Sequence, residues 1–303
     1  MNKIYGQWYE TTIQTTKEIS LQDYLREVVK VPKKLLHQMR MDKAITVNGK
    51  SILYTDIVKN NDKLQLKLFN DVDYGYEIAP IDVEIVYEDE HLLVANKKAG
   101  MNTHPNDEKN QTTLCNAIAY HLQINGEQRK INHIHRLDKD TSGLILFSKH
   151  GLSGALLDEM LTKREIKRTY LCLVEGRLRQ KKGTINAPIA QDRHTAGKRR
   201  VDEKGQHAIT HFKVVEYFKK EDVTLVECTL ETGRTHQIRV HLAHLGHPIV
   251  GDTLYDGNPS IKRQALHAYR LQFTHPFTNE EIDLVSKNTD LWYFDQLISN
   301  INF

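Results

Sequence analysis

Residues 133–149, with the sequence HIHRLDKDTSGLILFSK, contain the side chains best suited to acid–base or nucleophilic chemistry. Asp138 lies three residues after His135 in a turn-rich stretch, and an apolar strand is predicted from Leu144. A carboxylate on a loop next to a buried strand is held rigidly while it faces a cleft. It can act as a nucleophile or a general base. On its own, however, HRLD also fits a structural ion pair in which Asp138 caps a turn.

The stretch HRLDKDTSG resembles the signature motif of the RluA-type pseudouridine synthases, in which the Asp is the essential catalytic residue. Four further segments resemble motifs of that family in the same order, so the resemblance extends over most of the chain from about residue 80. They are residues 85–105 (IVYEDEHLLVANKKAGMNTHP), 166–176 (IKRTYLCLVEG), 230–252 (LETGRTHQIRVHLAHLGHPIVGD) and 263–276 (RQALHAYRLQFTHP). The first departs at Lys98, where the family usually has Pro, which affects the stiffness of a turn more than the chemistry.

The resemblance implies an isomerase that converts specific uridines in structured RNA to pseudouridine. The reaction breaks the bond between base and ribose and rejoins the ring through carbon. The isomerisation involves no net oxidation or reduction, so we expect no organic cofactor and no metal ion. Stacked RNA buries the target atoms, so the uridine must be extruded into a pocket. Large-subunit ribosomal RNA is the first expected substrate and tRNA the second.

The motifs also assign roles to individual residues. Asp138 is expected to be the catalytic carboxylate, Arg239 to pair with it, and Tyr170 to stack on the flipped uracil. Arg136 and Ile238 are expected to bind the substrate. Without the motifs, Tyr170 would be interpreted as a core tyrosine and Arg239 as an exposed helix charge.

The spacing of apolar residues predicts how Arg239 is positioned. Ile238, Leu242 and Leu245 lie at i, i+4 and i+7, which indicates a helix face, and Gly246 ends it. Arg239 is then beside the buried stripe. A guanidinium there can hold a carboxylate in bidentate geometry and favours its ionised form.

The elements around these motifs predict an α+β fold with a mixed, mainly antiparallel sheet, because strands outnumber helices without regular βαβ alternation. The catalytic domain is expected over residues 81–303. Residues 195–206 are predicted to form a long basic loop. Strands are expected at residues 143–149, 169–176, 211–218 and 223–232, and helices at residues 113–123 and 153–163.

The sequence of residues 1–72 predicts a small helix–helix–hairpin domain. Ser20 precedes a helix with Leu21, Leu25 and Val28 on one face, and a second helix follows Pro32. A hairpin with a turn at residues 48–49 and a closing strand at residues 63–69 complete this unit.

This unit resembles the RNA-binding domain named after ribosomal protein S-four. It departs from that pattern at residues 32–34 and at Asp42, where a glycine is usual. An acidic linker, residues 73–80, separates it from the catalytic domain. Its best candidates for contacts with RNA phosphates are Lys33, Lys34, Arg40 and Lys43. The alternative is a solvated basic helix with no role in RNA binding.

The histidines and cysteines do not show the spacing of a metal site. His236, His241, His244 and His247 are instead expected to form a polar surface that partly faces RNA. The three cysteines are far apart and lie among apolar neighbours, so we expect them in the core.

Composition limits the class of protein. The 303 residues carry a net charge of only +3, so any nucleic-acid site must come from local basic patches. No apolar run has the length of a membrane span, and the first residues lack a secretory signal. We therefore expect a cytoplasmic protein, and a monomer is the default expectation, because the sequence does not indicate an oligomeric state.

Two other functions fit parts of the sequence. A non-catalytic RNA-binding or ribosome-assembly factor would keep the fold, but it has no need of the set formed by Asp138, Tyr170 and Arg239. A hydrolase using Asp138 with a histidine lacks a partnered serine or cysteine nucleophile.

Overall fold

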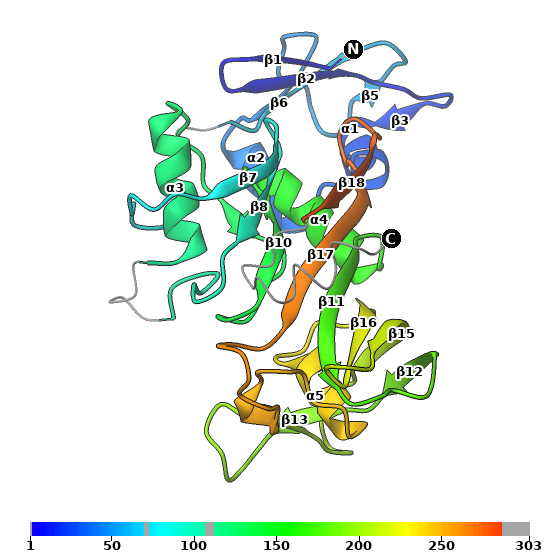
Figure 1. The fold of residues 1–303 in the computed structure, drawn as a ribbon. Helices are drawn as coiled ribbons and strands as arrows, with labels where there is room; N and C mark the ends of the chain where they lie inside the picture. Colours follow the sequence, from blue (N-terminus) through cyan, green and yellow to red (C-terminus); the bar gives the residue numbers. More distant parts are fainter. Residues whose placement is uncertain (1, 70–72, 107–111, 287–303) are drawn as a thin grey trace.

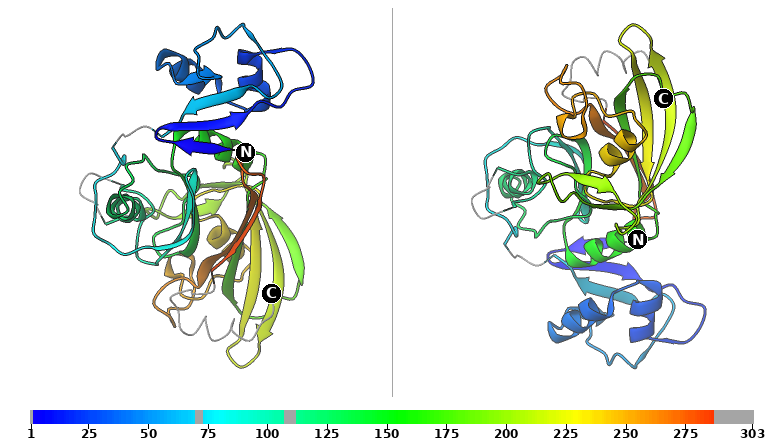
Figure 2. Two further views of the ribbon diagram at one scale, coloured as in Figure 1. Left: turned by 90° about the horizontal axis from the view of Figure 1, so that it is seen from above. Right: turned by 90° about the horizontal axis from the view of Figure 1, so that it is seen from below.

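The computed structural model describes residues 2–69, 73–106 and 112–286. A small N-terminal unit lies at one end of the molecule, and a large sheet extends away from it (Figures 1 and 2). None of the helices in the described ranges is long and apolar enough to span a membrane.

The N-terminal unit is built on a four-stranded antiparallel sheet in the order β1-β2-β6-β4. Two short strands, β3 and β5, pair beside it. A single turn of α-helix leads directly into a π-helical turn, and α2 follows. The bounds are β1 Lys3–Tyr5, β2 Trp8–Thr12, β3 Ile19–Ser20, α1 Leu21–Asp23, the π-turn Tyr24–Val28, α2 Lys33–Met41, β4 Ile45–Val47, β5 Ile57–Val58 and β6 Lys63–Lys67.

The predicted start of the first helix is confirmed, but its buried face is only partly so. Ser20 Oγ accepts a hydrogen bond from the Asp23 N–H at 3.1 Å, as expected of an N-cap. Val28 is 51% exposed, and Tyr24 is buried in its place. The π-turn accounts for this difference, because its wider turn shifts the angular positions of the side chains.

The predicted hairpin is wrong in its second strand. Asn48 and Gly49 both have positive φ, as a type I′ turn requires. The chain after this turn makes only one bridge, between Val47 and Lys50. β4 pairs instead with the predicted closing strand, β6, which also binds β2. The strands β1 and β2, which the sequence analysis did not predict, complete this sheet.

The N-terminal unit packs closely on the rest of the chain. Leu152 and Phe277 join the apolar cluster formed by the N-terminal residues. The ring of Phe277 stacks on His91, and Tyr9 meets both rings edge-on. The predicted linker also packs on the catalytic part, because the Asn116 side chain donates to the Glu77 carbonyl oxygen at 2.7 Å. The boundaries at residues 72 and 80 stay a prediction.

The remaining strands form a ten-stranded sheet. Its main order is β12-β15-β16-β11-β17-β10-β8-β7, with β18 on β17 and β9 on β10. Among the described strands, only β10 and β17 pair in parallel. The predicted mixed, mainly antiparallel α+β fold is confirmed. The bounds are β7 Glu84–Glu88, β8 Leu92–Lys97, β9 Asn132–His133, β10 Ser142–Ser148, β11 Lys167–Glu175, β12 Lys182–Asn186, β15 Ile209–Phe218, β16 Val223–Leu230, β17 Leu266–Thr274 and β18 Glu281–Val285.

The strand β17 joins two halves of this sheet. On one side it pairs with β11, and on the other it meets β10 over two residue pairs. The close approach occurs at Gly143, which has a φ of +115°. A Cβ atom at this position would lie 2.3 Å from the Ala268 carbonyl oxygen, so only glycine fits.

Three helices lie against the sheet: α3 Leu114–Ile124, α4 Gly151–Thr162 and α5 Gln237–His244. In α5, Ile238 and Leu242 are buried as predicted, but Leu245 is 39% exposed because it is the C-cap residue. The predicted loop at residues 195–206 instead contains a strand, β14 Arg199–Val201, which pairs with β13 Ile189–Gln191. The cysteines are free and buried, as expected.

Candidate active site

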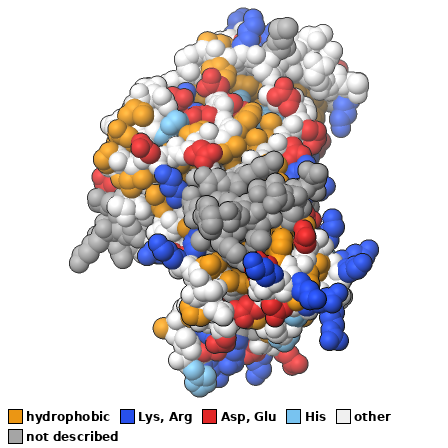
Figure 3. All heavy atoms as spheres, in the orientation of Figure 1, with side chains coloured by type: hydrophobic (Ala, Val, Ile, Leu, Met, Phe, Trp, Pro, Cys, Tyr) orange, Lys and Arg blue, Asp and Glu red, His pale blue; other side chains and the backbone are white. Residues whose placement is uncertain are grey.

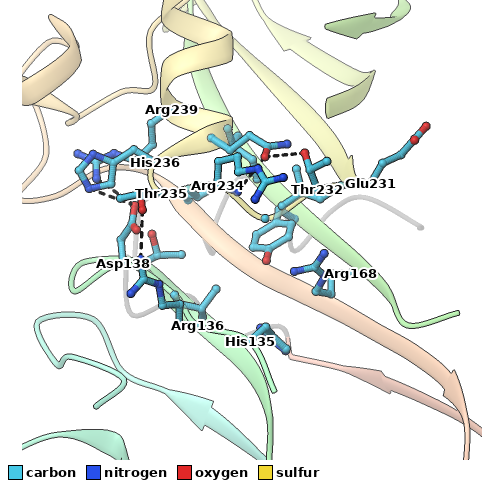
Figure 4. A pocket seen from close by; sticks show the side chains of 18 of the residues that line it. His135, Arg136, Asp138, Arg168, Glu231, Thr232, Arg234, Thr235, His236 and Arg239 are labelled. Carbon is cyan, nitrogen blue, oxygen red and sulfur yellow. Dashed lines mark hydrogen bonds and ion pairs between the residues drawn. The ribbon is translucent and has the colours of Figure 1, made fainter. Parts of the chain in front are cut away.

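A cavity of about 430 Å³ opens beside the junction of the two half-sheets. Its walls come from the loop before β10, the strand β11 and the segment that joins β16 to α5 (Figure 4). These are three of the segments that the sequence analysis singled out. Asp138, Tyr170, Arg136, Ile238 and Arg239, all predicted site residues, line this cavity.

The loop that carries Asp138 is anchored by side chains of residues 85–105. Lys97 is almost fully buried, and its ammonium group donates to the Lys139 carbonyl oxygen at 2.9 Å. Thr103 binds Leu137 through both its hydroxyl proton and its hydroxyl oxygen. The backbone on each side of Asp138 is therefore anchored, which restricts the position of the carboxylate.

Arg239 connects two carboxylates. Its Nη1 donates to Asp138 Oδ2 at 3.0 Å, which brings together the expected pair. The bidentate partner, however, is Asp252, whose two oxygens accept from Nε at 2.7 Å and from Nη2 at 2.9 Å. The expectation that Arg239 holds Asp138 in bidentate geometry is therefore wrong. The buried Asp252 occupies one edge of the guanidinium, and Nη1 alone contacts Asp138.

His236 lies beside this pair and was missed as a site residue. It precedes α5 in a left-handed conformation (φ 59°), which is uncommon for a residue other than glycine. Its Nδ1 lies 2.9 Å from the Tyr255 hydroxyl and its Nε2 lies 3.8 Å from Asp138 Oδ2. The Tyr255 hydroxyl accepts from the Arg199 N–H. Its own proton can therefore go to His236 Nδ1, which leaves the ring N–H on Nε2, facing the carboxylate.

Burial keeps the His236 ring and the Tyr255 hydroxyl neutral near pH 7. It lowers the pKa of His236, although Asp138 opposes this shift. It raises the pKa of Tyr255 to about 12. The Arg239 guanidinium lies 5.1 Å from the centre of the Tyr255 ring, so the ring packs against this cation. His236 and Asp252 belong to residues 230–252, one of the segments that resemble the family, and this was the signal that could have identified them. Tyr255 follows shortly after this segment.

Tyr170 and Ile238 form apolar walls of the cavity. Tyr170 is buried on β11, and burial raises the pKa of its hydroxyl, so it is protonated near pH 7. A neutral aromatic ring at the wall of a polar cavity can pack against a planar base.

Arg136 lies at the mouth of the cavity with an exposed side chain. Its Nη2 donates to Thr235 Oγ1 at 3.1 Å, which links the Asp138 loop to the segment before α5. Its position allows it to meet a substrate that enters from solvent.

The four basic residues predicted to contact RNA phosphates do not belong to this cavity. Lys33, Lys34, Arg40 and Lys43 are exposed on and after α2 in the N-terminal unit. The Arg40 guanidinium lies 5.2 Å from the centre of the Tyr54 ring. Their role in RNA binding stays a prediction.

The histidines of residues 230–252 do not share one surface. His241 is fully buried and contacts Thr210 Oγ1 and the Ala187 carbonyl oxygen through its two ring nitrogens. The prediction of a common polar surface is wrong for this residue, because α5 turns it toward the core. Within the described ranges, no group of three or more His, Cys, Asp or Glu residues is placed to hold a metal ion.

Two protein families match this chain. The RNA pseudouridylate synthase family matches residues 91–244, which include the loop with Asp138 and the whole of α5. The N-terminal domain of the RluD ribosomal pseudouridine synthases matches residues 9–64.

Relatives match over most of their length. The chain is 49% identical over 265 residues to the uncharacterized RNA pseudouridine synthase YhcT of Bacillus subtilis, covering 85% of this chain and 86% of the relative. It is 38% identical over 252 residues to the ribosomal large subunit pseudouridine synthase D of Pseudomonas aeruginosa, covering 78% of each.

Solved structures agree with this assignment. Human RNA pseudouridylate synthase domain containing 1 superimposes with a TM-score of 0.58 at 25% identity, covering 69% of this chain and 84% of the human one. Human RNA pseudouridylate synthase domain containing 4, at 23% identity and a TM-score of 0.59, covers 73% and 94% and shares the fold. The expected enzyme class is thus confirmed: the chain belongs to the RluA-type RNA pseudouridylate synthases and is an RNA pseudouridine synthase.

Proposed function

We propose that this enzyme isomerises specific uridines of large-subunit ribosomal RNA, with Asp138 as the catalytic carboxylate. The observation that carries the assignment of Asp138 is its contact with Arg239. A partly exposed carboxylate at the wall of a cavity is paired with a buried guanidinium, and Asp252 fixes the orientation of that guanidinium. The guanidinium holds the Asp138 carboxylate in place through Nη1 at 3.0 Å.

The reaction has three stages in this cavity. The target uridine is flipped into it, and its base packs against Tyr170. The bond between C1′ and N1 breaks with both electrons leaving on the base, while Asp138 either attacks the ribose or removes one of its protons. After the base turns, C5 bonds to C1′. In the first route this displaces the Asp138 carboxylate from C1′, and in the second route Asp138 returns its proton to the ribose. The C5 proton is lost and N1 gains one, so no atoms or electrons are gained or lost overall.

The remaining site residues position the participants. Arg239 holds Asp138, and Ile238 and Tyr170 enclose the base. Arg136 at the mouth is placed to contact the RNA next to the flipped nucleotide. Each of these roles needs only the chain's own side chains.

The choice of RNA is supported by the relatives. Several are named ribosomal large subunit pseudouridine synthase D, and the N-terminal residues match the domain that such enzymes carry. The exposed cations of α2 suit an extended RNA surface outside the cavity.

Asp138→Asn tests the catalytic assignment. The substitution preserves shape but removes the charge, so we expect folded protein that binds RNA normally and forms no detectable pseudouridine. The measurement is single-turnover pseudouridine formation in large-subunit RNA. Asp140→Asn, on the same loop but outside this cavity, is the matched control and should retain activity. A near wild-type rate for Asp138→Asn would remove Asp138 from the mechanism.

The target is tested by a transcriptome-wide pseudouridine map of strains with and without the gene. Loss of one or a few sites in large-subunit ribosomal RNA is the expected result. Loss confined to tRNA would contradict this choice of substrate while leaving the role of Asp138 open to its own test.

A further inference from the structure

Two buried hydrogen-bond donors line the active-site cavity away from Asp138. Arg168 lies on β11 two residues before Tyr170, and His135 precedes β10. Figure 4 shows both on one side of the cavity and Asp138 on the other. The mechanism above uses neither residue.

Both side chains are more than nine-tenths buried, with exposed fractions of 9% for Arg168 and 7% for His135. Arg168 Nε and His135 Nδ1 have no hydrogen-bond partner among the described residues. A buried guanidinium without a carboxylate partner is costly, because its charge is removed from water without compensation. Such an arrangement persists when a ligand supplies the missing partner.

His135 is neutral, and the position of its single ring proton follows from its contacts. Burial, with the nearby charge of Arg168, lowers the pKa of His135 to about 3, so the ring is neutral at physiological pH. Its Nε2 accepts the Leu146 N–H at 3.3 Å. The single ring proton is therefore on Nδ1, the unpartnered atom.

We propose that the Arg168 guanidinium binds a carbonyl oxygen of the flipped uracil and stabilises the negative charge that the base acquires when its bond to ribose breaks. This inference rests on the proposed function, because it takes the cavity of Asp138 as the site of reaction. Arg168 is then a further catalytic residue, and His135 is its neutral neighbour in the cavity wall.

The chemistry of the base explains why donors are needed here. When the C1′–N1 electron pair leaves with uracil, the charge is shared by N1, O2 and O4. Donors that are already oriented in a site shielded from water stabilise such charge most effectively. They also hold the detached ring, which has no covalent bond to prevent its escape.

The symmetry of uracil lets one donor serve both halves of the reaction. A half-turn about the axis through N3 and C6 replaces N1 by C5 next to the ribose. The same half-turn exchanges O2 and O4. A donor that binds O2 before the rotation therefore meets O4 afterwards, so the protein does not have to rearrange.

The packing of Arg168 favours a fixed guanidinium. A Cβ atom built on Gly233 would lie 3.3 Å from Arg168 Nη1, so the chain at Gly233 closes against this group. Glycine at this position leaves room for the guanidinium at the cavity wall.

The test combines Arg168→Met with substrates that carry 2-thiouridine or 4-thiouridine at the target position. Sulfur accepts hydrogen bonds more weakly than oxygen. We expect Arg168→Met to lower the single-turnover rate by about 100-fold, the usual effect of losing a donor to a developing oxyanion. The Kd for RNA should stay nearly unchanged. Both thio substrates should slow the wild type, and this slowing should be much smaller in the variant.

Arg270→Met is the matched control. Arg270 lies on the neighbouring strand β17, where it is exposed and bound to Asp283, and it does not line the cavity. This variant should keep both the rate and the full thio effects of the wild type.

Three results would overturn the inference. Equal thio effects in the wild type and Arg168→Met would show that Arg168 does not contact the base. A methylphosphonate next to the target that slows the wild type but not the variant, without a change in the thio effects, would assign Arg168 to a phosphate. If neither Arg168→Met nor the charge-preserving Arg168→Lys folds, Arg168 is structural. Failure of the proposed function is separate, because it shows as a wild-type rate in Asp138→Asn.

Discussion

Arg239 is the residue on which the geometry of the candidate site depends. Its contacts are unequal, with two hydrogen bonds to the buried Asp252 and one to the partly exposed Asp138. A guanidinium held along one edge cannot rotate, so it presents one nitrogen to Asp138 in a fixed direction. Asp252 therefore acts on Asp138 through Arg239 and is a positioning residue.

Asp252→Asn should disturb both stability and catalysis. Replacing one partner of a buried ion pair should lower the free energy of unfolding by about 2 to 4 kcal/mol. The rate should fall by about 10- to 100-fold because Arg239 loses its fixed orientation, while the Kd for RNA stays the same. Urea denaturation and single-turnover kinetics measure these effects.

The matched control is Asp283→Asn, which breaks an exposed pair with Arg270. It should cost less than about 1 kcal/mol and leave activity intact. If the two variants lose the same stability and the same activity, burial of the Asp252 pair has no special importance.

At this scale, the sequence predicted the contact between Asp138 and Arg239 but not the residue that fixes it. Asp252 is 13 residues beyond Arg239, after the end of α5. Its contact with Arg239 depends on how the chain folds back after the helix. The spacing of residues in the sequence does not indicate this path. Tertiary packing also determines that His241 points inward while His236 faces the site.

The elements around the site meet most closely where β10 pairs with β17. Gly143 is the contact point, directly after the turn that begins at Asp138. The backbone of β17 occupies the space where any other residue would have its Cβ atom. The close pairing at Gly143 therefore joins the Asp138 loop rigidly to the other half of the sheet.

Gly143→Ala should destabilise the protein strongly. Its Cβ atom would lie 2.3 Å from a backbone oxygen, in a conformation that is already strained for alanine. We expect a loss of about 3 kcal/mol or more in the free energy of unfolding. Gly126→Ala is the control, because Gly126 also has positive φ, but a Cβ atom there would have no other atom within 4 Å. It should lose only about 1 kcal/mol. Similar losses would mean that strain alone, and not the contact with β17, explains the glycine.

Long, strongly apolar elements were predictable, and short ones that depend on partners were not. The strands β10, β11, β15 and β16 and the helices α3 and α4 lie where apolar patterns placed them. By contrast, β14 is polar and three residues long, and it forms because β13 lies opposite. Its sequence, two arginines followed by a valine, is equally compatible with a loop.

The whole molecule combines the candidate active-site cavity with a small N-terminal unit whose apolar core includes residues of the catalytic part. Phe277, Leu152 and His91 pack against the N-terminal residues, so removing residues 1–72 would expose an apolar surface. Truncation would therefore alter stability as well as RNA binding. Substitution of exposed charges separates the two effects.

On the face shown in Figure 3, Lys and Arg side chains lie over the N-terminal unit and over the part of the sheet near β12 and β15. They do not form a single patch there. This distribution agrees with a net charge of only +3 and with binding through several separate phosphate contacts.

Replacing Lys33, Lys34, Arg40 and Lys43 together by Ala should weaken RNA binding in a salt-dependent way. Each lost phosphate contact changes the slope of log affinity against log salt by about 0.9 on duplex nucleic acid, so the slope should flatten by at most about 3 to 4. Catalysis at saturating RNA should persist. Binding titrations across a range of salt concentrations give the slope.

The control replaces four other exposed lysines: Lys17, Lys59, Lys219 and Lys220. The net charge falls equally, so a specific surface on α2 predicts a larger effect from the first set. Identical slopes for wild type and the first variant would indicate that the N-terminal unit does not engage phosphate. It would then be better interpreted as a protein-contact module.

The central position of β17 has a consequence for synthesis on the ribosome. The chain makes the loop of Asp138 and the strand of Tyr170 early, but the strand that joins their two half-sheets comes almost last. Pairing distant segments is slow, because loop closure costs entropy before contacts repay it. A nascent chain therefore holds two separate half-sheets until β17 emerges and inserts between them. The enzyme becomes competent in one late step, and shortened chains that end before this strand have no assembled cavity with which to modify RNA.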